Sequence, residues 1–213
     1  MQELIKFLCE DLFDKRARNH RLIIGKPEDT LEILKAVYEK ARTKEELLCT
    51  WHDASTITKP MDFFEPILRL KYGGYYEQLK EEEFFKSLVE KNEKSGVFQL
   101  ASLCGKDENS KMPNAKKLPV FFIDGIEELL FKFDYDHLDE DGIKRLFSRD
   151  FMEKPLSKGF GDCLRRYLHQ ERDKAVFYGR VRNTQSLEFH ATLGNHHYLF
   201  YCGNFAFLFT GDL

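Results

Sequence analysis

The sequence lacks the features that mark several large classes of protein. Its 213 residues contain five cysteines, none of them in a C-x-x-C pair, which argues against a disulfide scaffold and a zinc ribbon. The first apolar pattern, residues 1–13, is interrupted by acids, so it predicts neither a signal peptide nor a membrane span. A formal net charge of only −3 supplies no general attraction to nucleic acid or anionic membranes. We therefore expect a cytoplasmic protein with no membrane partner.

Phenylalanine is abundant, with 20 copies, and charged residues make up 32% of the chain. This composition is typical of a globular protein with a solvated surface and a Phe-rich core. Apolar residues recur at helical spacing over residues 3–16, 28–42, 61–71 and 77–94, the last with Phe84, Phe85, Leu88 and Val89 facing inward. Short apolar runs at 22–24, 47–51, 118–123 and 174–178 predict strands. Because strands alternate with helices, we predict βαβ units and a largely parallel sheet.

Two of the predicted strands end at an acid. The run Leu118 to Ile123 stops at Asp124, and the strand that begins at Leu47 stops at Asp53. Side chains just beyond the carboxyl ends of parallel strands lie where α/β sheets bind ligands, and two carboxylates there can converge on one cation. Asp53 and Asp124 are therefore candidate metal ligands. Asp124 is equally suited to cap a following helix, and the two interpretations are compatible.

Polar residues also follow the first and the fourth of these strands. Gly25-Lys26 lies between a strand and a helix, where it is either a residual phosphate cradle or a simple turn with a solvated lysine. Arg180, Arg182 and Asn183 follow the strand at 174–178, and one or more of them could face the Asp124 end of the sheet. At the end of the chain, residues 196–200 and 205–209 flank Cys202-Gly203-Asn204 and predict a β-hairpin.

Taken in order, residues 21–183 resemble the core of AAA+-related P-loop ATPases, a group with archaeal and signalling members. The similar segments are the second strand and the helix after it, the Walker B strand, and a helix followed by the sensor strand: Leu48–Ala54, Phe63–Leu70, Leu118–Leu130, Phe160–His169 and Lys174–Gly179. The resemblance implies an α/β three-layer sandwich of the P-loop NTPase type with a mainly parallel sheet.

On this resemblance, the chain divides into an N-terminal helix (1–20), a P-loop NTPase-like core (21–185) and a C-terminal β-hairpin packed on the core (186–213). It implies ATP and Mg²⁺ as cofactors. The residues that would bind the nucleotide are Gly25, Lys26, Asp124, Arg180 and Asn183.

The phosphate loop departs from the family pattern. A working loop reads G-x-x-x-x-G-K-[ST], because its backbone N–H groups must wrap the phosphates. Here the turn is short and has no second glycine, and Pro27 removes a backbone donor. Gly125 follows Asp124, where members that hydrolyse ATP usually carry glutamate. The sequence thus resembles a degenerate member, and we expect it not to be an enzyme.

The expected role is a regulatory or interaction module that binds a protein partner and acts on nucleic acid, if at all, through that partner. Three alternatives stay open. The chain could be an active ATPase with an atypical phosphate loop, or a metal-dependent phosphodiesterase or nuclease built on Asp53 and Asp124. It could also be a structural protein joined to its partner through the Phe-rich tail, residues 198–209.

Overall fold

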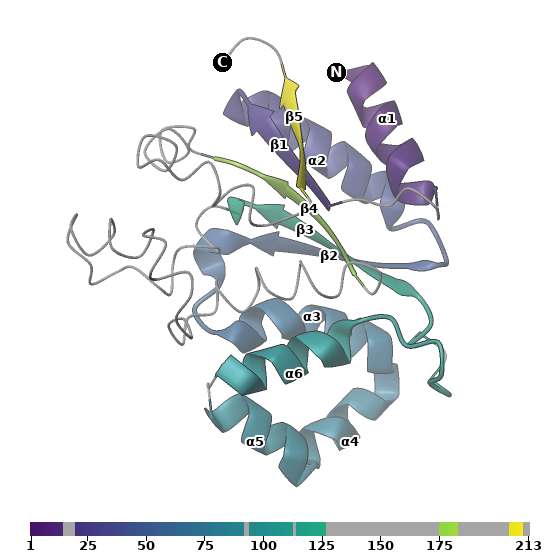
Figure 1. The fold of residues 1–213 in the computed structure, drawn as a ribbon, viewed down its shortest axis with the longest axis vertical. Helices are drawn as coiled ribbons and strands as arrows, with labels where there is room; N and C mark the ends of the chain where they lie inside the picture. Colours follow the sequence, from purple (N-terminus) through teal and green to yellow (C-terminus); the bar gives the residue numbers. More distant parts are fainter. Residues whose placement is uncertain (15–19, 92–93, 113, 127–174, 183–204, 211–213) are drawn as a thin grey trace, which may run out of the picture.

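A single parallel sheet organises the chain in the computed structural model (Figure 1), which describes residues 1–14, 20–91, 94–112, 114–126, 175–182 and 205–210. The five strands are β1 (His20–Gly25), β2 (Leu47–Asp53), β3 (Leu118–Asp124), β4 (Val176–Arg180) and β5 (Phe205–Thr210). They lie in the order β2-β3-β4-β1-β5, and each neighbouring pair is parallel. This order differs from both common doubly wound orders, 3-2-1-4-5-6 and 2-1-3-4-5. The predicted largely parallel α/β sheet is confirmed.

Two helices cover one face of the sheet, α1 (Gln2–Phe13) and α2 (Pro27–Ala41). Their buried side chains, among them Leu8 and Leu34, pack with Phe122 of β3 and Tyr178 of β4. A buried polar contact ties α1 to this face, because Arg21 of β1 is paired with Asp11 of α1. The hydroxyl of Tyr178 lies 3.1 Å from the same carboxylate. The N-terminal helix is therefore held by specific contacts as well as by apolar packing.

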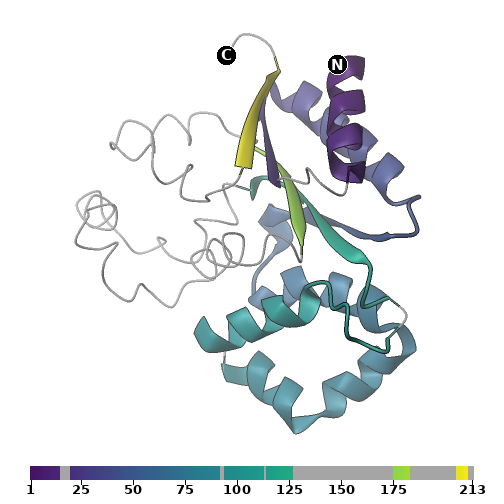
Figure 2. The ribbon, with the colours of Figure 1, turned by 45° about the vertical axis from the view of Figure 1, so that its right-hand side comes forward.

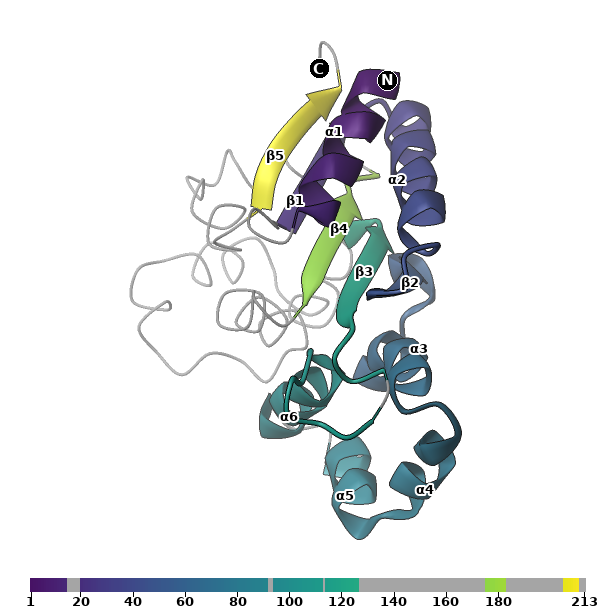
Figure 3. The same cartoon turned by 90° about the vertical axis from the view of Figure 1, so that its right-hand side faces the viewer.

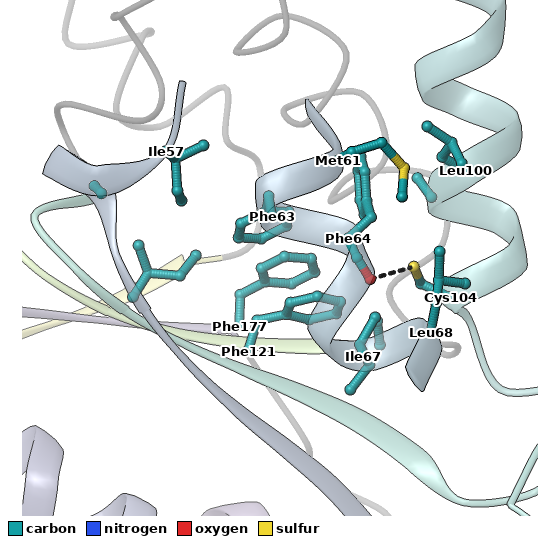
Figure 4. Close-up of a cluster of buried hydrophobic side chains, with 14 of the residues drawn as sticks. Ile57, Met61, Phe63, Phe64, Ile67, Leu68, Leu100, Cys104, Phe121 and Phe177 are labelled. Atoms are coloured by element: carbon teal, nitrogen blue, oxygen red, sulfur yellow. Dashed lines mark hydrogen bonds between the residues drawn. The ribbon is translucent and has the colours of Figure 1, made fainter. Parts of the chain in front are cut away.

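The opposite face packs on α3 (Pro60–Tyr72) and α6 (Lys94–Cys104). Its centre is a stack of three aromatic rings (Figure 4). The Phe121 ring lies parallel to that of Phe177, with 4.7 Å between centroids, and to that of Phe63, at 5.0 Å. All three side chains are fully buried. They join β3, β4 and α3, and they confirm the expectation of a Phe-rich core.

Between α3 and α6 the chain forms a helical lobe that lies farther from the sheet (Figures 1 and 3). It begins with the short 3-10 turn Gly73–Tyr75 and continues through α4 (Tyr76–Glu81) and α5 (Glu83–Lys91). The prediction of one helix over 77–94 was wrong, since the chain breaks at Glu82 and α6 begins at Lys94. Of the four side chains expected to face inward, Phe85 and Leu88 are buried, but Phe84 and Val89 are 52% and 38% exposed.

The C-terminal segment differs from the predicted hairpin. Residues 205–210 form β5, which pairs with β1 in parallel register from His20↔Phe205 to Gly25↔Thr210. The segment therefore extends the main sheet at the side of β1 (Figure 2). The other half of the expected hairpin, residues 196–200, lies outside the described residues. The division at residues 20 and 185 stays a prediction.

Within the part of the chain that the structure describes, no helix is both long enough and apolar enough to cross a membrane.

Candidate functional site

The parallel sheet brings the polar strand ends to one edge. Asp53 is the register partner of Asp124, Asp124 is the partner of Arg180, and Arg180 is the partner of Ile23, two residues before Gly25. Asp53, Asp124 and Arg180 each follow by two residues a side chain that packs toward α1 and α2, so all three side chains face that side of the sheet. The three polar strand ends therefore lie at one edge of the sheet, as predicted from the parallel strands. In the strand order, β4 lies between β1 and β3.

The turn between β1 and α2 is tight. A single residue, Lys26, separates Gly25 at the end of β1 from Pro27 at the start of α2. Lys26 is exposed, and its carbonyl accepts the first helical hydrogen bond, from the backbone N–H of Thr30. Pro27 has no N–H to offer a phosphate, and the first turn carries the acids Glu28 and Asp29, which disfavour an anion at this helix end. The turn is thus too short to wrap a phosphate group.

Arg180 connects the acid of β3 to this turn. Its Nε atom lies 2.6 Å from Oδ1 of Asp124, and both side chains are buried, with 7% and 10% exposed. This is a charge contact whose angle does not meet hydrogen-bond geometry. The Nη1 atom donates to the carbonyl of Pro27, at 3.1 Å, and lies 3.5 Å from Oγ1 of Thr30. The Arg180 side chain therefore spans from Asp124 to the first turn of α2.

Arg182 forms a second bridge on the same carboxylate. Its Nε atom donates to Oδ1 of Asp124 at 2.8 Å, and its Nη2 atom donates to Oδ1 of Asp53 at 2.7 Å. Asp53 also accepts a hydrogen bond from the backbone N–H of Ser55 in the turn that follows β2. The four side chains form a network of two acids and two guanidinium groups with no net charge.

The network shifts the ionisation of both acids. Burial alone would raise the pKa of Asp124, but contacts with Arg182 and Arg180 outweigh it and lower the pKa. Burial opposes the shift at Asp53 as well, yet hydrogen bonds from Ser55 and Arg182 lower the pKa of its carboxyl group. The hydrogen bond to Asp124 is the largest cause of a raised pKa for Arg182. All three groups are held in their charged forms at neutral pH.

The residue after Asp124 also departs from a hydrolytic site. Gly125 has a φ angle of 82°, in the left-handed region that favours glycine. Its N–H donates to the carbonyl of Arg180. A glutamate placed here to orient water would be strained, so the local backbone is built for glycine.

These residues do not fit Mg²⁺-ATP as the family resemblance implies. The carboxylate that would hold the metal is already in contact with two guanidinium groups. The space between that acid and the first turn of α2 is crossed by the Arg180 side chain. Chemically, the arrangement can lock the strand ends together, whereas phosphate binding would require displacing Arg180.

The predicted site residues divide into three groups. Asp53, Asp124 and Arg180 come together, Gly25 and Lys26 lie at the same edge in the turn before α2, and Asn183 lies outside the described residues. Asp124 was also predicted to cap a helix that follows it, but the residues after Ile126 lie outside the described part of the chain. In the described part of the chain, no group of three or more His, Cys, Asp or Glu side chains gathers to hold a metal ion.

Sequence reasoning missed the pairing of the arginines with the acids. Arg180 was predicted to face the Asp124 end of the sheet and to bind nucleotide, but Arg182 was not assigned to Asp53. Alternation along the chain indicates that residues 180 and 182 share one face, whereas the position of β4 beside β3 comes from the tertiary structure.

The comparisons with known proteins show a likeness among solved structures. No family model matches the sequence, and no curated protein matches it. Among solved structures, the chain is similar to the Aeropyrum pernix ORC2 protein in its ADPNP and ADP complexes, with a TM-score of 0.45 and 11% identity. The match covers 98% of this chain and 46% of that protein, so the chain spans less than half of that protein's length.

Proposed function

We propose that this chain is an AAA+-like, P-loop NTPase-like protein whose nucleotide site has been replaced by an ion-pair network. It acts as a regulatory or interaction module that binds a protein partner and does not hydrolyse ATP. The position of Arg180 carries this proposal. Its guanidinium group contacts Asp124 on one side and Pro27 on the other, which leaves a triphosphate and its metal without their principal ligands.

The energetic reason is the cost of opening the network. Binding Mg²⁺-ATP would require the metal to displace the guanidinium group of Arg182, and the triphosphate to separate the Arg180 side chain, 7% exposed, from its acid. A buried charge that loses its partner costs about 3–5 kcal/mol. An ordinary nucleotide affinity in the micromolar range, about 8 kcal/mol, would lose about half of its binding free energy to this rearrangement.

We expect millimolar Mg²⁺-ATP to leave the melting temperature unchanged within about 1 °C. A ligand present at a hundredfold excess over its dissociation constant would stabilise the protein by about 2.7 kcal/mol, which corresponds to a rise of several degrees. Differential scanning fluorimetry with ATP, ADP and a non-hydrolysable analogue measures this directly.

The matched variant is Lys26→Ala, which removes the one lysine of the turn and leaves the network intact. We expect its melting curve to equal that of the native protein with and without nucleotide. A nucleotide-dependent rise that Lys26→Ala abolishes would overturn the proposal and favour the active ATPase.

The partner surface that we propose is the helical lobe. Among the described residues, four of the six exposed large apolar side chains lie on or beside it: Leu70, Tyr75, Phe84 and Val89, the other two being Met1 and Phe7. A contiguous exposed apolar patch is typical of protein contact sites, and we propose that these four side chains contribute to one. The lobe also stands away from the sheet, where a second protein could reach it (Figure 3).

Site-specific photo-crosslinking tests the lobe. A crosslinker at Phe84 is expected to give a defined protein adduct in the host cell, because this side chain is 52% exposed. The control position is Lys35, an exposed residue of α2 on the other side of the sheet. The same adducts from both positions, or none from Phe84, would contradict a partner surface on the lobe.

A further inference from the structure

Arg182, two residues beyond the end of β4, joins two strands to which it does not belong. It contacts Asp53 at the end of β2, at 2.7 Å, and Asp124 at the end of β3, at 2.8 Å. The two acids are register partners in a parallel ladder, so their Cα atoms are about 5 Å apart and their side chains leave the same face. One cationic group therefore sits against two converging carboxylates.

The positions of both acids are fixed by other contacts. The Asp53 carboxylate also accepts hydrogen bonds from the backbone N–H and the hydroxyl of Ser55, two residues further along the chain. The Asp124 carboxylate is in contact with Arg180. Two fixed, ionised carboxylates repel each other unless a cation lies between them, and the Arg182 guanidinium supplies that cation from within the chain.

We propose that Arg182 is an intramolecular substitute for a divalent metal ion: its guanidinium group occupies the cation position between Asp53 and Asp124 and makes this edge of the sheet independent of metal. The two acids are then a latent site for an oxygen-liganded ion such as Mg²⁺ or Mn²⁺. This inference deepens the proposed function, because it says what replaces the metal ion of the nucleotide site. Its evidence is independent of the nucleotide, since it rests on Asp53, Asp124 and Arg182 alone.

A guanidinium group and a divalent metal ion can occupy the same position because both are held by carboxylate oxygens. Mg²⁺ is held in proteins by one or two carboxylates, with water completing its shell, and a guanidinium group also takes carboxylate oxygens as its partners. A tethered cation has an effective concentration in the millimolar range, so it excludes a weakly bound free ion. The site is open to solvent at one end, since the Asp53 side chain is 42% exposed and that of Arg182 is 26% exposed.

The test compares the native protein with Arg182→Ala in Mn²⁺ alone, without nucleotide. Millimolar MnCl₂ is expected to leave the melting temperature of the native protein unchanged and to raise that of Arg182→Ala by about 3 °C, the shift for a ligand near ten times its dissociation constant. Electron paramagnetic resonance of free Mn²⁺ gives an independent count of bound ions, with one ion expected on the variant. Because nucleotide is left out, failure here is distinguishable from failure of the proposed function.

Two further variants control the charge. Arg182→Lys keeps a cation on the tether and should show no response to Mn²⁺, and Asp53→Asn combined with Arg182→Ala should lose the response. If Arg182→Ala is unfolded without metal, we expect Mn²⁺ to restore its circular dichroism spectrum, and Arg182→Gln repeats the comparison with a milder change. A folded Arg182→Ala that binds no Mn²⁺, an unfolded one that Mn²⁺ does not rescue, or equal binding by the native protein would overturn the proposal.

Discussion

Replacing Asp124 with alanine is expected to lower the free energy of unfolding by about 3–5 kcal/mol, the usual cost of removing one partner from a buried ion pair. The side chain of Arg180 is only 7% exposed, and without Asp124 its charge would remain buried against the first turn of α2. Arg182 would lose one of its two carboxylates at the same time. Urea denaturation followed by circular dichroism measures the change.

The sign of this effect separates two interpretations of the acid. If Asp124 stood in an empty metal site, its removal would relieve repulsion with Asp53 and leave stability unchanged or raised. In the ion-pair network, its removal destabilises the fold. A variant Asp124→Ala as stable as the native protein would therefore contradict the network.

Asp53→Ala is the matched control. Its side chain is 42% exposed, and exposed ion pairs contribute about 0–1 kcal/mol. We expect the two acids to differ in effect by several-fold, although they end neighbouring strands in register. Equal losses would mean that burial does not set the strength of this network.

Phe121→Ala is expected to lower the free energy of unfolding by about 3–5 kcal/mol, the range for truncating a buried phenylalanine. Its ring is fully buried and lies between those of Phe63 and Phe177, with nearly parallel planes at 14° and 7°. The truncation leaves a cavity where β3, β4 and α3 meet, and it removes both ring contacts. Thermal and urea unfolding should report the same loss.

Phe84→Ala provides the comparison within the same residue type. Because the Phe84 side chain is 52% exposed on α5, its truncation is expected to change stability by no more than about 0.5 kcal/mol. A large loss of unfolding free energy from Phe84→Ala, or a small loss from Phe121→Ala, would contradict the burial of Phe121 and the exposure of Phe84.

The strands were predicted well because their signals are local. A buried parallel strand is a short continuous apolar run, and Leu118 to Asp124 has this form from its first residue to its acid. The strand Leu47–Asp53 is less uniform, because Thr50 and His52 interrupt its apolar residues, and the structure extends it to its predicted end. Since the carboxyl ends of parallel strands share one edge, the placement of Asp53 and Asp124 at the same edge could be predicted without coordinates.

The helical lobe was predicted poorly. Apolar residues stand in the adjacent pairs Phe84-Phe85 and Leu88-Val89, which cover an arc of about 140° on a helix, with Phe85 and Leu88 at its centre and Phe84 and Val89 at its margins. The structure buries the central two and leaves the marginal two exposed. The width of the buried stripe depends on α6, which contacts both α3 and α5, and sequence periodicity does not determine that packing.

The sequence by itself determined a parallel α/β sheet with acids at two strand ends and a short turn after the first strand. The order of the strands was decided by the tertiary structure, which places β4 between β1 and β3. Periodicity and propensity act over a few residues, whereas strand neighbours are chosen by packing between segments as distant as residues 23 and 180. That choice sets Arg180 between Asp124 and the first turn of α2, where its guanidinium group contacts both.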